Sequence, residues 1–280
     1  MVGAAGLYIT APKTTDLSAI AGLEPDVVAG EQVFLAGGCA SCHSTKDAKG
    51  DAKLVLTGGR AFFSDFGTFF APNISPDPVD GIGTWQPIDL VNAMRHGSSP
   101  DGEHYYPVFP YGSYSRASLQ DMVSLYSYLM TLPPDQTPSR DHDVGFPFNI
   151  RLSLGGWKTL FLSDDWVIED LQSPELERGR YLVEALGHCG ECHTPRNVLG
   201  GLDNSRWLAG AKNPNGEGRI PDITPAKLSW SANDVAFYFE SGFKPDFDTA
   251  GGHMVEVVEN LAGLTPEDRQ AIAAYLKALP

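Results

Sequence analysis

The strongest constraint in this sequence is a short motif that occurs twice. Residues 39–43 read CASCH and residues 189–193 read CGECH, so both follow the pattern Cys-x-x-Cys-His. All cysteines of the chain lie in these two copies: Cys39, Cys42, Cys189 and Cys192. None is left for a structural disulfide elsewhere, so we expect one chemistry that is used twice.

A Cys-x-x-Cys pair commonly serves a zinc site, a redox disulfide or covalent haem attachment. In both copies the next residue is a histidine, His43 or His193. Two thiols can add to the vinyl groups of a haem while the adjacent imidazole reaches the iron, and a short helical turn places the three groups on one side. We therefore predict two covalently bound haem c groups, with His43 and His193 as iron ligands.

The two alternatives make different demands on the chain. A zinc site with four cysteine ligands would require the two pairs to meet at one ion. A thioredoxin-like redox pair is expected in a βαβ context, and the sequence shows no such strand pattern. Zinc is therefore the stronger of the two alternatives to haem.

Similarity between the two halves of the chain extends well beyond the cysteines. Residues 29–38 (AGEQVFLAGG) parallel residues 178–187 (RGRYLVEALG), and both have the pattern of an amphipathic helix with a glycine near its start. Residues 118–134 parallel residues 265–280. Each of these begins with a Ser or Thr suited to an N-cap, has an acid in the first turn and contains Leu-Pro at its end. The chain is therefore predicted to be a tandem repeat.

The middle of each half is rich in loops. The tripeptides GTW (83–85) and LSW (228–230) correspond, and each is predicted to precede a further helix. The remaining segments carry many of the 30 glycines and 21 prolines. Loops of this length count against a compact domain, unless they bury their apolar residues on a large prosthetic group. We expect the loops to wrap the haems.

On these residues the chain resembles a dihaem member of the class I cytochrome c group. It is most similar to the cytochrome subunits of membrane-associated bacterial dehydrogenases for alcohols, sugar acids and related substrates. The segments that carry the resemblance are CASCHST, APNISPDPVDGIGTW, LVNAMRHGSSPDGEHYYP, YSYLMTLP, CGECHTPRNVLGG and AAYLKALP. The resemblance covers nearly the whole chain from about residue 25. It implies a mainly α fold of two tandem class I cytochrome c domains, with long loops wrapping covalent haems.

The sequence is divided into four predicted segments. Residues 1–22 form an apolar N-terminal arm, interpreted either as the remnant of a signal or anchor or as a frayed end. Residues 23–135 and 176–280 form the two cytochrome c domains. Residues 136–175 form a linker strap that contains FPFNIRLSLGGWKTLFL. Its aromatic residues predict a strap packed across one or both domains that fixes how the haems face each other, or a short extra helix covering one domain.

Met254 is predicted to be the sixth ligand of the second haem. It is the only methionine in the second domain and lies in the loop TAGGHMVEVV ahead of the terminal helix, where the family pattern has its ligand. His253 is its neighbour and its rival. A methionine ligand raises the reduction potential relative to histidine.

The sixth ligand of the first haem is an open question. The resemblance implies Tyr-Pro-x-Met-Pro-Tyr, but the chain has YYPVFPYGSY, with Phe109 at the methionine position. His104 stands in the same loop and is our candidate ligand. The alternatives are an iron that is five-coordinate or water-bound, and a methionine from elsewhere. We interpret the methionines of this domain as core residues: Met94, Met122 and Met130.

Burying the haem carboxylates requires hydrogen-bond donors. Five residues are candidates for haem contacts, with plain loop packing or solvent exposure as the alternative for each: Arg60, Asn73, Trp85, Arg196 and Trp230. We interpret His96 as a surface residue, and His142 and His188 as structural or surface residues.

These observations predict a periplasmic dihaem cytochrome c that transfers electrons one at a time from a partner dehydrogenase to a downstream cytochrome, quinone or oxidase. No nucleophile elbow or phosphate loop is found, so a non-catalytic carrier or oxidoreductase subunit is favoured over an enzyme. The alternative is a peroxidase or sulfur-compound oxidoreductase that acts at an open first haem. A net charge of −15 argues against nucleic acid as a partner. Membrane association through an N-terminal anchor is a further expectation.

Overall fold

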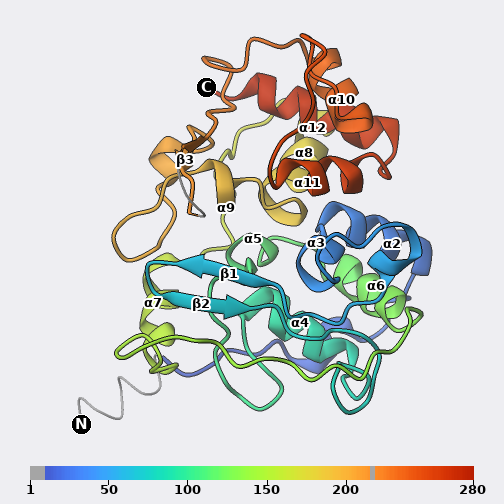
Figure 1. The fold of residues 1–280 in the computed structure, drawn as a ribbon, viewed down its shortest axis with the longest axis vertical. Coiled ribbons are helices and arrows are strands. Elements are labelled where there is room, and N and C mark those ends of the chain that lie inside the picture. The colour runs from blue at the N-terminus through green and yellow to red at the C-terminus, as the bar shows by residue number, and fades with distance from the viewer. Residues whose placement is uncertain (1–9, 215–217) are drawn as a thin grey trace. The chain divides into compact units, whose positions relative to one another are not determined.

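The computed structural model describes residues 10–214 and 218–280. The chain divides into two compact units, and the main division falls between Asp164 and Asp165, inside the predicted linker strap. The first unit comprises residues up to 34 and residues 39–164, and the second comprises residues 35–38 and 165–280. Both units are built mainly from helices, as predicted (Figure 1). In the described part of the chain, no helix has the length and apolar character needed to cross a membrane.

The first unit combines helices with one short hairpin. Its elements are η1 (Leu17–Ile20), α2 (Val27–Ala36), α3 (Cys39–His43), η2 (Gly50–Leu54), β1 (Ala61–Ser64), β2 (Gly67–Phe70), α4 (Pro87–His96), α5 (Tyr111–Tyr114), α6 (Leu119–Leu129) and α7 (Ser153–Phe161).

The second unit repeats the same order with small changes. Its elements are α8 (Pro174–Arg180), η3 (Tyr181–Leu186), α9 (Gly190–His193), η4 (Asn204–Arg206), β3 (Ala211–Lys212), β4 (Arg219–Ile220), α10 (Ala232–Ser241), α11 (Met254–Leu261) and α12 (Pro266–Ala278). The segment predicted as one amphipathic helix before the second motif is α8 followed by the π-helical turns of η3.

The last helix of each predicted cytochrome domain, α6 or α12, begins where the sequence predicts. The Ser118 hydroxyl accepts a hydrogen bond from the backbone N–H of Asp121 at 3.0 Å. The Thr265 hydroxyl accepts one from Asp268 at 3.1 Å. Each bond satisfies an N–H group that the first helical turn leaves without an intrahelical partner, so α6 and α12 start at equivalent positions.

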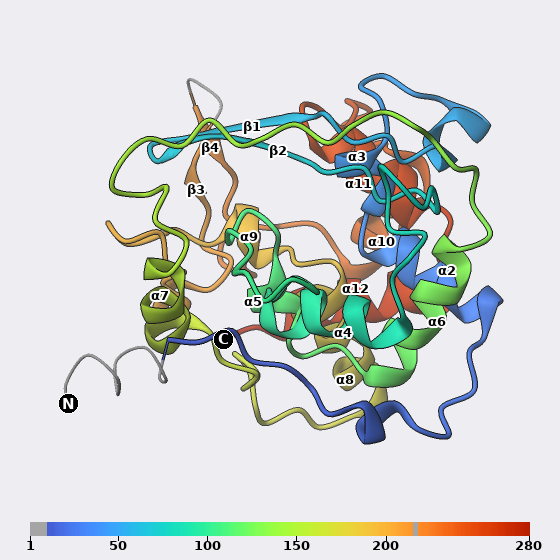
Figure 2. The ribbon, with the colours of Figure 1, turned by 90° about the horizontal axis from the view of Figure 1, so that it is seen from below.

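A close crossing of two helices forms the base of each unit. In the first unit α2 crosses α6, and a Cβ added to Gly30 would overlap the carbonyl of Ser124 and lie 2.9 Å from the Cβ of Tyr128. In the second unit α8 crosses α12, and a Cβ on Gly179 would overlap the carbonyl of Ala271. Figures 1 and 2 both show these pairs side by side. Only glycine permits so close an approach of the two backbones.

Two short hairpins lie in the predicted loop regions. In the first, β1 pairs antiparallel with β2 so that Ala61 faces Phe70. In the second, β3 pairs antiparallel with β4 so that Ala211 faces Ile220. These strands have at most four residues, too few to show a clear alternation of apolar and polar positions. The hairpins therefore leave no periodic pattern from which the sequence would predict them.

The first part of the linker strap packs on the first unit. Asp143 bridges to Thr68 at the edge of β2, with backbone hydrogen bonds of 2.8 Å in both directions. The hydroxyl of Tyr106 donates to the carbonyl of Phe148 at 3.1 Å. Leu154 of α7 joins the buried cluster that Tyr106 forms with Phe69. The strap therefore contains both a packed extended segment and an extra helix, the two forms considered from the sequence.

The last part of the strap packs on the second unit. The fully buried carboxylate of Glu184 accepts hydrogen bonds from the backbone N–H of Val167 at 2.7 Å and of Ile168 at 3.2 Å. The hydroxyl of Tyr275 on α12 donates to the same carboxylate. A buried carboxylate is stable only when donors surround it, so Glu184 ties this segment to the helical base.

Residues 10–22 of the predicted N-terminal arm contact the first unit, and residues 1–9 lie outside the described residues. The backbone N–H of Thr15 donates to the side-chain oxygen of Asn92 at 2.7 Å, and its hydroxyl bonds the ring of His96 at 2.9 Å. His96 was predicted to be a surface residue. Instead it is half-buried, and burial lowers its pKa to about 4.

The helix crossing gives a direct test of the fold. We expect Gly30→Ala to lower the stability of the first unit by about 1–3 kcal/mol, because the overlap with α6 outweighs the better helix propensity of alanine. The matched control is Gly156→Ala in α7, where the added Cβ would meet no heavy atom within 4 Å. Thermal unfolding of the haem-loaded protein gives the midpoint temperature of each variant. Equal midpoints for the two variants would contradict the crossing.

Candidate haem sites

Each cysteine motif folds into its own short helix. Residues Cys39–His43 form α3, and Gly190–His193 form α9 with Cys189 as the N-cap residue. Burial raises the pKa of the Cys39 thiol and of the Cys189 thiol to about 12. A reactive redox pair needs the opposite shift, since the thiolate is the attacking species. The environment of these thiols therefore does not favour the redox-disulfide alternative.

The two motif histidines are held in the same way. Nδ1 of His43 lies 2.8 Å from the carbonyl oxygen of Pro72, and Nδ1 of His193 lies 2.8 Å from that of Pro221. A carbonyl only accepts, so each Nδ1 carries the proton and donates it. Burial lowers the pKa of both rings, which keeps them neutral. Each ring therefore presents the lone pair of Nε2, the arrangement of a metal-ligating histidine.

A glycine supports each histidine from behind. The carbonyl of His43 accepts a hydrogen bond from Gly58, and that of His193 accepts one from Gly210, both at 2.7 Å. The φ angles of these glycines are +75° and +77°, in the left-handed region that other residues rarely adopt. A Cβ at Gly210 would also lie 2.7 Å from the carbonyl oxygen of Ile220. Both positions therefore require glycine.

One more backbone hydrogen bond joins the loops around the motif histidine in each unit. The backbone N–H of Ile74 donates to the carbonyl of Leu56 at 3.1 Å, and Ile223 donates to Leu208 at 3.0 Å. Both leucine side chains are fully buried. We call the set of motif histidine, glycine, leucine and proline-containing loop the proximal frame. It occurs twice with matching distances.

The residues of the proximal frame fit a covalent haem. Each unit offers two thiols on one short helix and one neutral imidazole with its Nε2 available, the donor set that haem c attachment uses. The zinc alternative needs three or more ligands at one ion. Among the described residues, no group of three or more His, Cys, Asp or Glu is arranged to hold a metal ion.

Met254, the predicted sixth ligand in the second unit, lies at the start of α11. The sequence analysis placed it in a loop, whereas the structure makes it the first helical residue after that loop. The preceding Gly252 has a φ of +58°, and His253, its predicted rival, is exposed. Met254 is half-buried, so its thioether is neither enclosed in the core nor fully in solvent. Its role as ligand remains a prediction.

His104, the candidate ligand of the first haem, has both ring nitrogens engaged. Nε2 donates to the carbonyl of Thr10 at 2.8 Å, and Nδ1 accepts from the amine of Lys158 at 3.0 Å. The side chain is 3% exposed. An imidazole with both nitrogens hydrogen-bonded has no lone pair for iron, so this arrangement does not support the prediction that His104 is a ligand. His104 instead anchors the N-terminal arm and α7.

Asn73 also has a different role from the predicted haem contact. Its side-chain amide donates to the carbonyls of Asp135 at 2.8 Å and Thr137 at 2.9 Å, and its oxygen accepts from Ser75 at 2.9 Å. These bonds use both amide hydrogens. Asn73 therefore holds the start of the linker strap, and none of its donors is available to a haem carboxylate.

The remaining candidate haem contacts have protein partners too. Arg60 donates to the carbonyl of Ser41 inside the first motif. Arg196 forms an ion pair with Glu191 of the second motif. These two arginines therefore lie beside the motifs, and their contact with haem carboxylates remains a prediction.

The two tryptophans lie before equivalent helices. Trp85 is half-buried, and its carbonyl accepts from the hydroxyl of Tyr126 at 2.6 Å. Trp230 is half-buried and its ring lies 5.2 Å from that of Tyr238 in an edge-on arrangement. No described contact assigns either ring to a haem, so both stay predictions.

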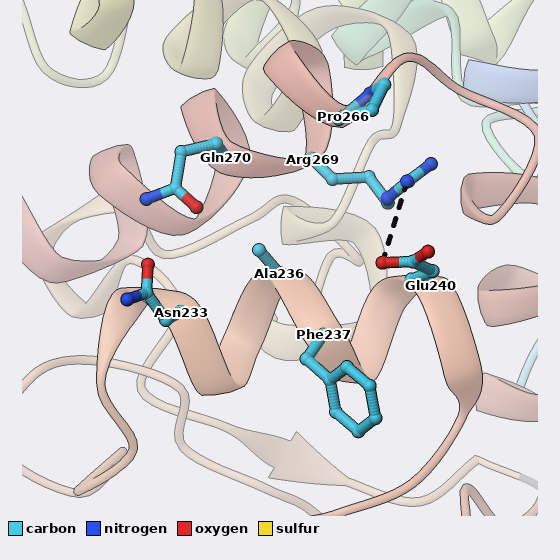
Figure 3. A pocket seen from close by; sticks show the side chains of 7 residues that line it. All are labelled: Asn233, Ala236, Phe237, Glu240, Pro266, Arg269 and Gln270. Atoms are coloured by element: carbon cyan, nitrogen blue, oxygen red, sulfur yellow. Dashed lines mark ion pairs between the residues drawn. The ribbon is translucent and has the colours of Figure 1, made fainter.

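A shallow surface pocket lies apart from these residues. It opens between α10 and α12, where Arg269 faces Glu240 at 3.8 Å (Figure 3). Its lining includes none of the predicted haem residues. We assign it no function.

Sequence reasoning missed the supporting residues of the proximal frame. The signal was present, since PNIS (72–75) in the first half corresponds to PDIT (221–224) in the second. In both segments the second residue accepts from a backbone N–H two positions on, at 2.9 Å. Aligning these segments would have identified Pro72 and Pro221 before the structure was known.

A duplicated Cys-x-x-Cys-His helix with a hydrogen-bonded proximal histidine defines a c-type cytochrome. Consistent with this, a profile of the family described as Cytochrome c matches residues 27–133. Over 280 residues the chain is 58% identical to a protein of Cereibacter sphaeroides named "Diheme cytochrome c-type", covering 100% of this chain and 95% of the relative. The chain belongs to the dihaem c-type cytochromes, and it binds two covalent haem c groups.

Other relatives are subunits of dehydrogenases. The chain is 38% identical over 264 residues to the fructose dehydrogenase cytochrome subunit of Gluconobacter japonicus, with 91% of this chain and 53% of the relative covered. It is 36% identical over 269 residues to the gluconate 2-dehydrogenase cytochrome c subunit of Pantoea cypripedii, with 89% and 58% covered. The chain therefore spans little more than half the length of these two subunits.

Replacement of Met254 tests its role. We expect Met254→Leu to remove the low-spin thioether signature of one haem, because leucine offers no donor to iron. Met254→His should keep a six-coordinate iron but lower its reduction potential by on the order of 0.1 V or more, within the roughly 0.8 V that axial ligands span. Absorption spectroscopy and redox titration measure these changes.

The matched control for Met254 is Met94→Leu. Met94 lies on α4 with a side chain that is 4% exposed, and its replacement by leucine nearly conserves volume. We expect no change in the spectrum of either haem. A Met254→Leu spectrum that matches the wild type would show that another group ligates the second iron.

Proposed function

We propose that this chain is a periplasmic electron-transfer subunit or carrier. It would take electrons one at a time from a partner dehydrogenase and pass them to a downstream cytochrome, quinone or oxidase. The observation that carries this proposal is the duplicated cysteine motif with its proximal frame, which equips one chain with two attachment sites for the same redox group. The names of the dehydrogenase-subunit relatives support the choice of partner.

The chain's own residues hold and tune the redox group. When bound, haem c supplies one-electron exchange between ferric and ferrous iron. The cysteine pairs fix its position, and the bond from each motif histidine to a proline carbonyl fixes the ring orientation and raises the basicity of Nε2. Because backbone atoms pack closely around Gly58 and Gly210, we expect small rearrangement when the charge of the site changes.

The charge of the chain favours one kind of partner surface. A net charge of −15 would steer a protein with a basic docking face and repel acidic ones. We expect association with such a partner to weaken as salt screens these charges. The proposed periplasmic location follows from the chemistry of thioether formation, which belongs to exported c-type cytochromes.

Electron delivery from a copurified dehydrogenase tests the proposal. The tagged, haem-loaded chain is isolated from its native cells with whatever binds it, and the substrate of the copurified dehydrogenase is added without a mediator. We expect the haem absorbance to change to the ferrous form within the turnover time of the dehydrogenase. A double variant, Cys189→Ala with Cys192→Ala, controls for the second haem and should show about half of the absorbance change.

Two outcomes would contradict the proposal. In the first, the haems stay ferric while the dehydrogenase turns over with an artificial acceptor, which would exclude this electron donor. In the second, the isolated chain catalyses substrate turnover without any partner. That result would favour the peroxidase or sulfur-compound oxidoreductase alternative.

A further inference from the structure

The loop that follows the middle helix has the same fold in both units. Helix α4 ends at Gly97 and α10 ends at Gly242, with φ angles of +59° and +77°. The carbonyl of Gly97 accepts from Tyr105 at 2.7 Å, and that of Gly242 accepts from Ala250 at 2.9 Å. Each helix therefore leads into a loop that folds back on its last residue.

Two further contacts confirm the match residue by residue. Ser98 bridges to His104 in the first unit, and Phe243 bridges to Thr249 in the second. Inside each loop a backbone bond closes the turn, from Ser99 to Glu103 at 2.9 Å and from Lys244 to Asp248 at 2.8 Å. Each residue of the first loop and its counterpart in the second loop are the same number of residues apart in the sequence.

With the same interval, Met254 of the second unit corresponds to Phe109 of the first, and Thr249 corresponds to His104. If the residues are counted from the motif histidines instead, Met254 corresponds to His104. This second alignment is wrong, because the loops between the motif and the middle helix differ in length between the two units. At the position of the predicted methionine ligand, the first unit therefore has a phenyl ring, which has no lone pair to donate. The residue at the position of His104 in the second unit is a threonine, and His104 itself is engaged by Thr10 and Lys158.

The other described methionines of the first unit do not correspond to ligand positions. The shared helix end places Met94 at the position of Phe239. The shared N-caps, Ser118 and Thr265, place Met122 at the position of Arg269 and Met130 at that of Lys277. None of these three residues of the second unit is a methionine or histidine.

The surroundings of Phe109 are aromatic. Its ring centroid lies 6.0 Å from that of Tyr105, 5.7 Å from Tyr114 and 6.4 Å from Tyr111. The amine of Lys158 lies 4.7 Å from the centroid of the Tyr111 ring, so a cationic group borders this aromatic cluster.

We propose that the haem held by Cys39, Cys42 and His43 has no side-chain ligand at its sixth position, and that this position binds small neutral molecules of the diatomic class such as carbon monoxide or nitric oxide. The juxtaposition of Phe109 with three tyrosines forms the aromatic surroundings of that site. This ligand site is independent of any dehydrogenase partner.

Carbon monoxide is the probe that tests this site. In the reduced, haem-loaded wild-type protein we expect one of the two haems to bind it, seen as a shift of about half of the Soret absorbance. Before addition, electron paramagnetic resonance of the ferric protein should show one high-spin and one low-spin haem. If both haems are low-spin and neither binds carbon monoxide, the proposal is overturned.

Three variants assign the site to the first unit. Phe109→Met supplies the missing donor, so we expect carbon monoxide binding to fall at least about tenfold and both haems to become low-spin. Phe109→Leu removes the ring without adding a donor and should still bind carbon monoxide at one haem. Met254→Leu should leave the second haem without its sixth ligand, so that twice as much of the haem binds carbon monoxide.

A fourth variant separates the proposal from the His104 alternative. If His104 were the ligand, His104→Ala would newly create carbon monoxide binding at the first haem, whereas we expect the bound fraction to stay at one haem. Unchanged carbon monoxide binding in Phe109→Met would also refute the assignment. The mass of each variant shows whether both haems are attached. If a variant does not assemble, carbon monoxide binding and the spin states of the wild-type protein test the proposal.

Discussion

The structure depends on one hydrogen bond in each unit, from the motif histidine to a proline carbonyl. This bond sets the tautomer of His43 and His193 and leaves the lone pair of Nε2 for iron. The backbone beside each histidine is held in turn by a glycine in the left-handed region, Gly58 or Gly210, which donates to the carbonyl of that histidine. The long loops are therefore fixed by backbone hydrogen bonds rather than by regular secondary structure.

Duplication explains what is constant and what differs between the units. The helix crossing at a glycine, α2 with α6 or α8 with α12, and the proximal frame are present in both. The linker strap packs differently on the two units, through Asp143 and α7 on the first and through Glu184 on the second. The loop after the middle helix also differs: the first unit has Phe109 where the second has Met254, and its His104 is bound by Lys158 of α7.

Local patterns made part of the fold predictable. The cysteine motifs, the N-caps Ser118 and Thr265 and the tandem order follow from residues close together in sequence. The roles of His104 and Asn73 depend on partners 54 and 62 residues away, which no local pattern reveals. The hairpins are too short to show periodicity, and counting from the motif histidines fails because the intervening loops differ in length.

The mass of the denatured polypeptide tests the central claim most directly. After extraction with acidic organic solvent, which removes non-covalent haem, the account predicts a mass that exceeds that of the polypeptide by two haem groups. Replacing Cys39 and Cys42 by alanine should remove one increment, and replacing Cys189 and Cys192 should remove the other. A bare polypeptide mass for the wild-type chain would contradict the claim that both motifs attach haem.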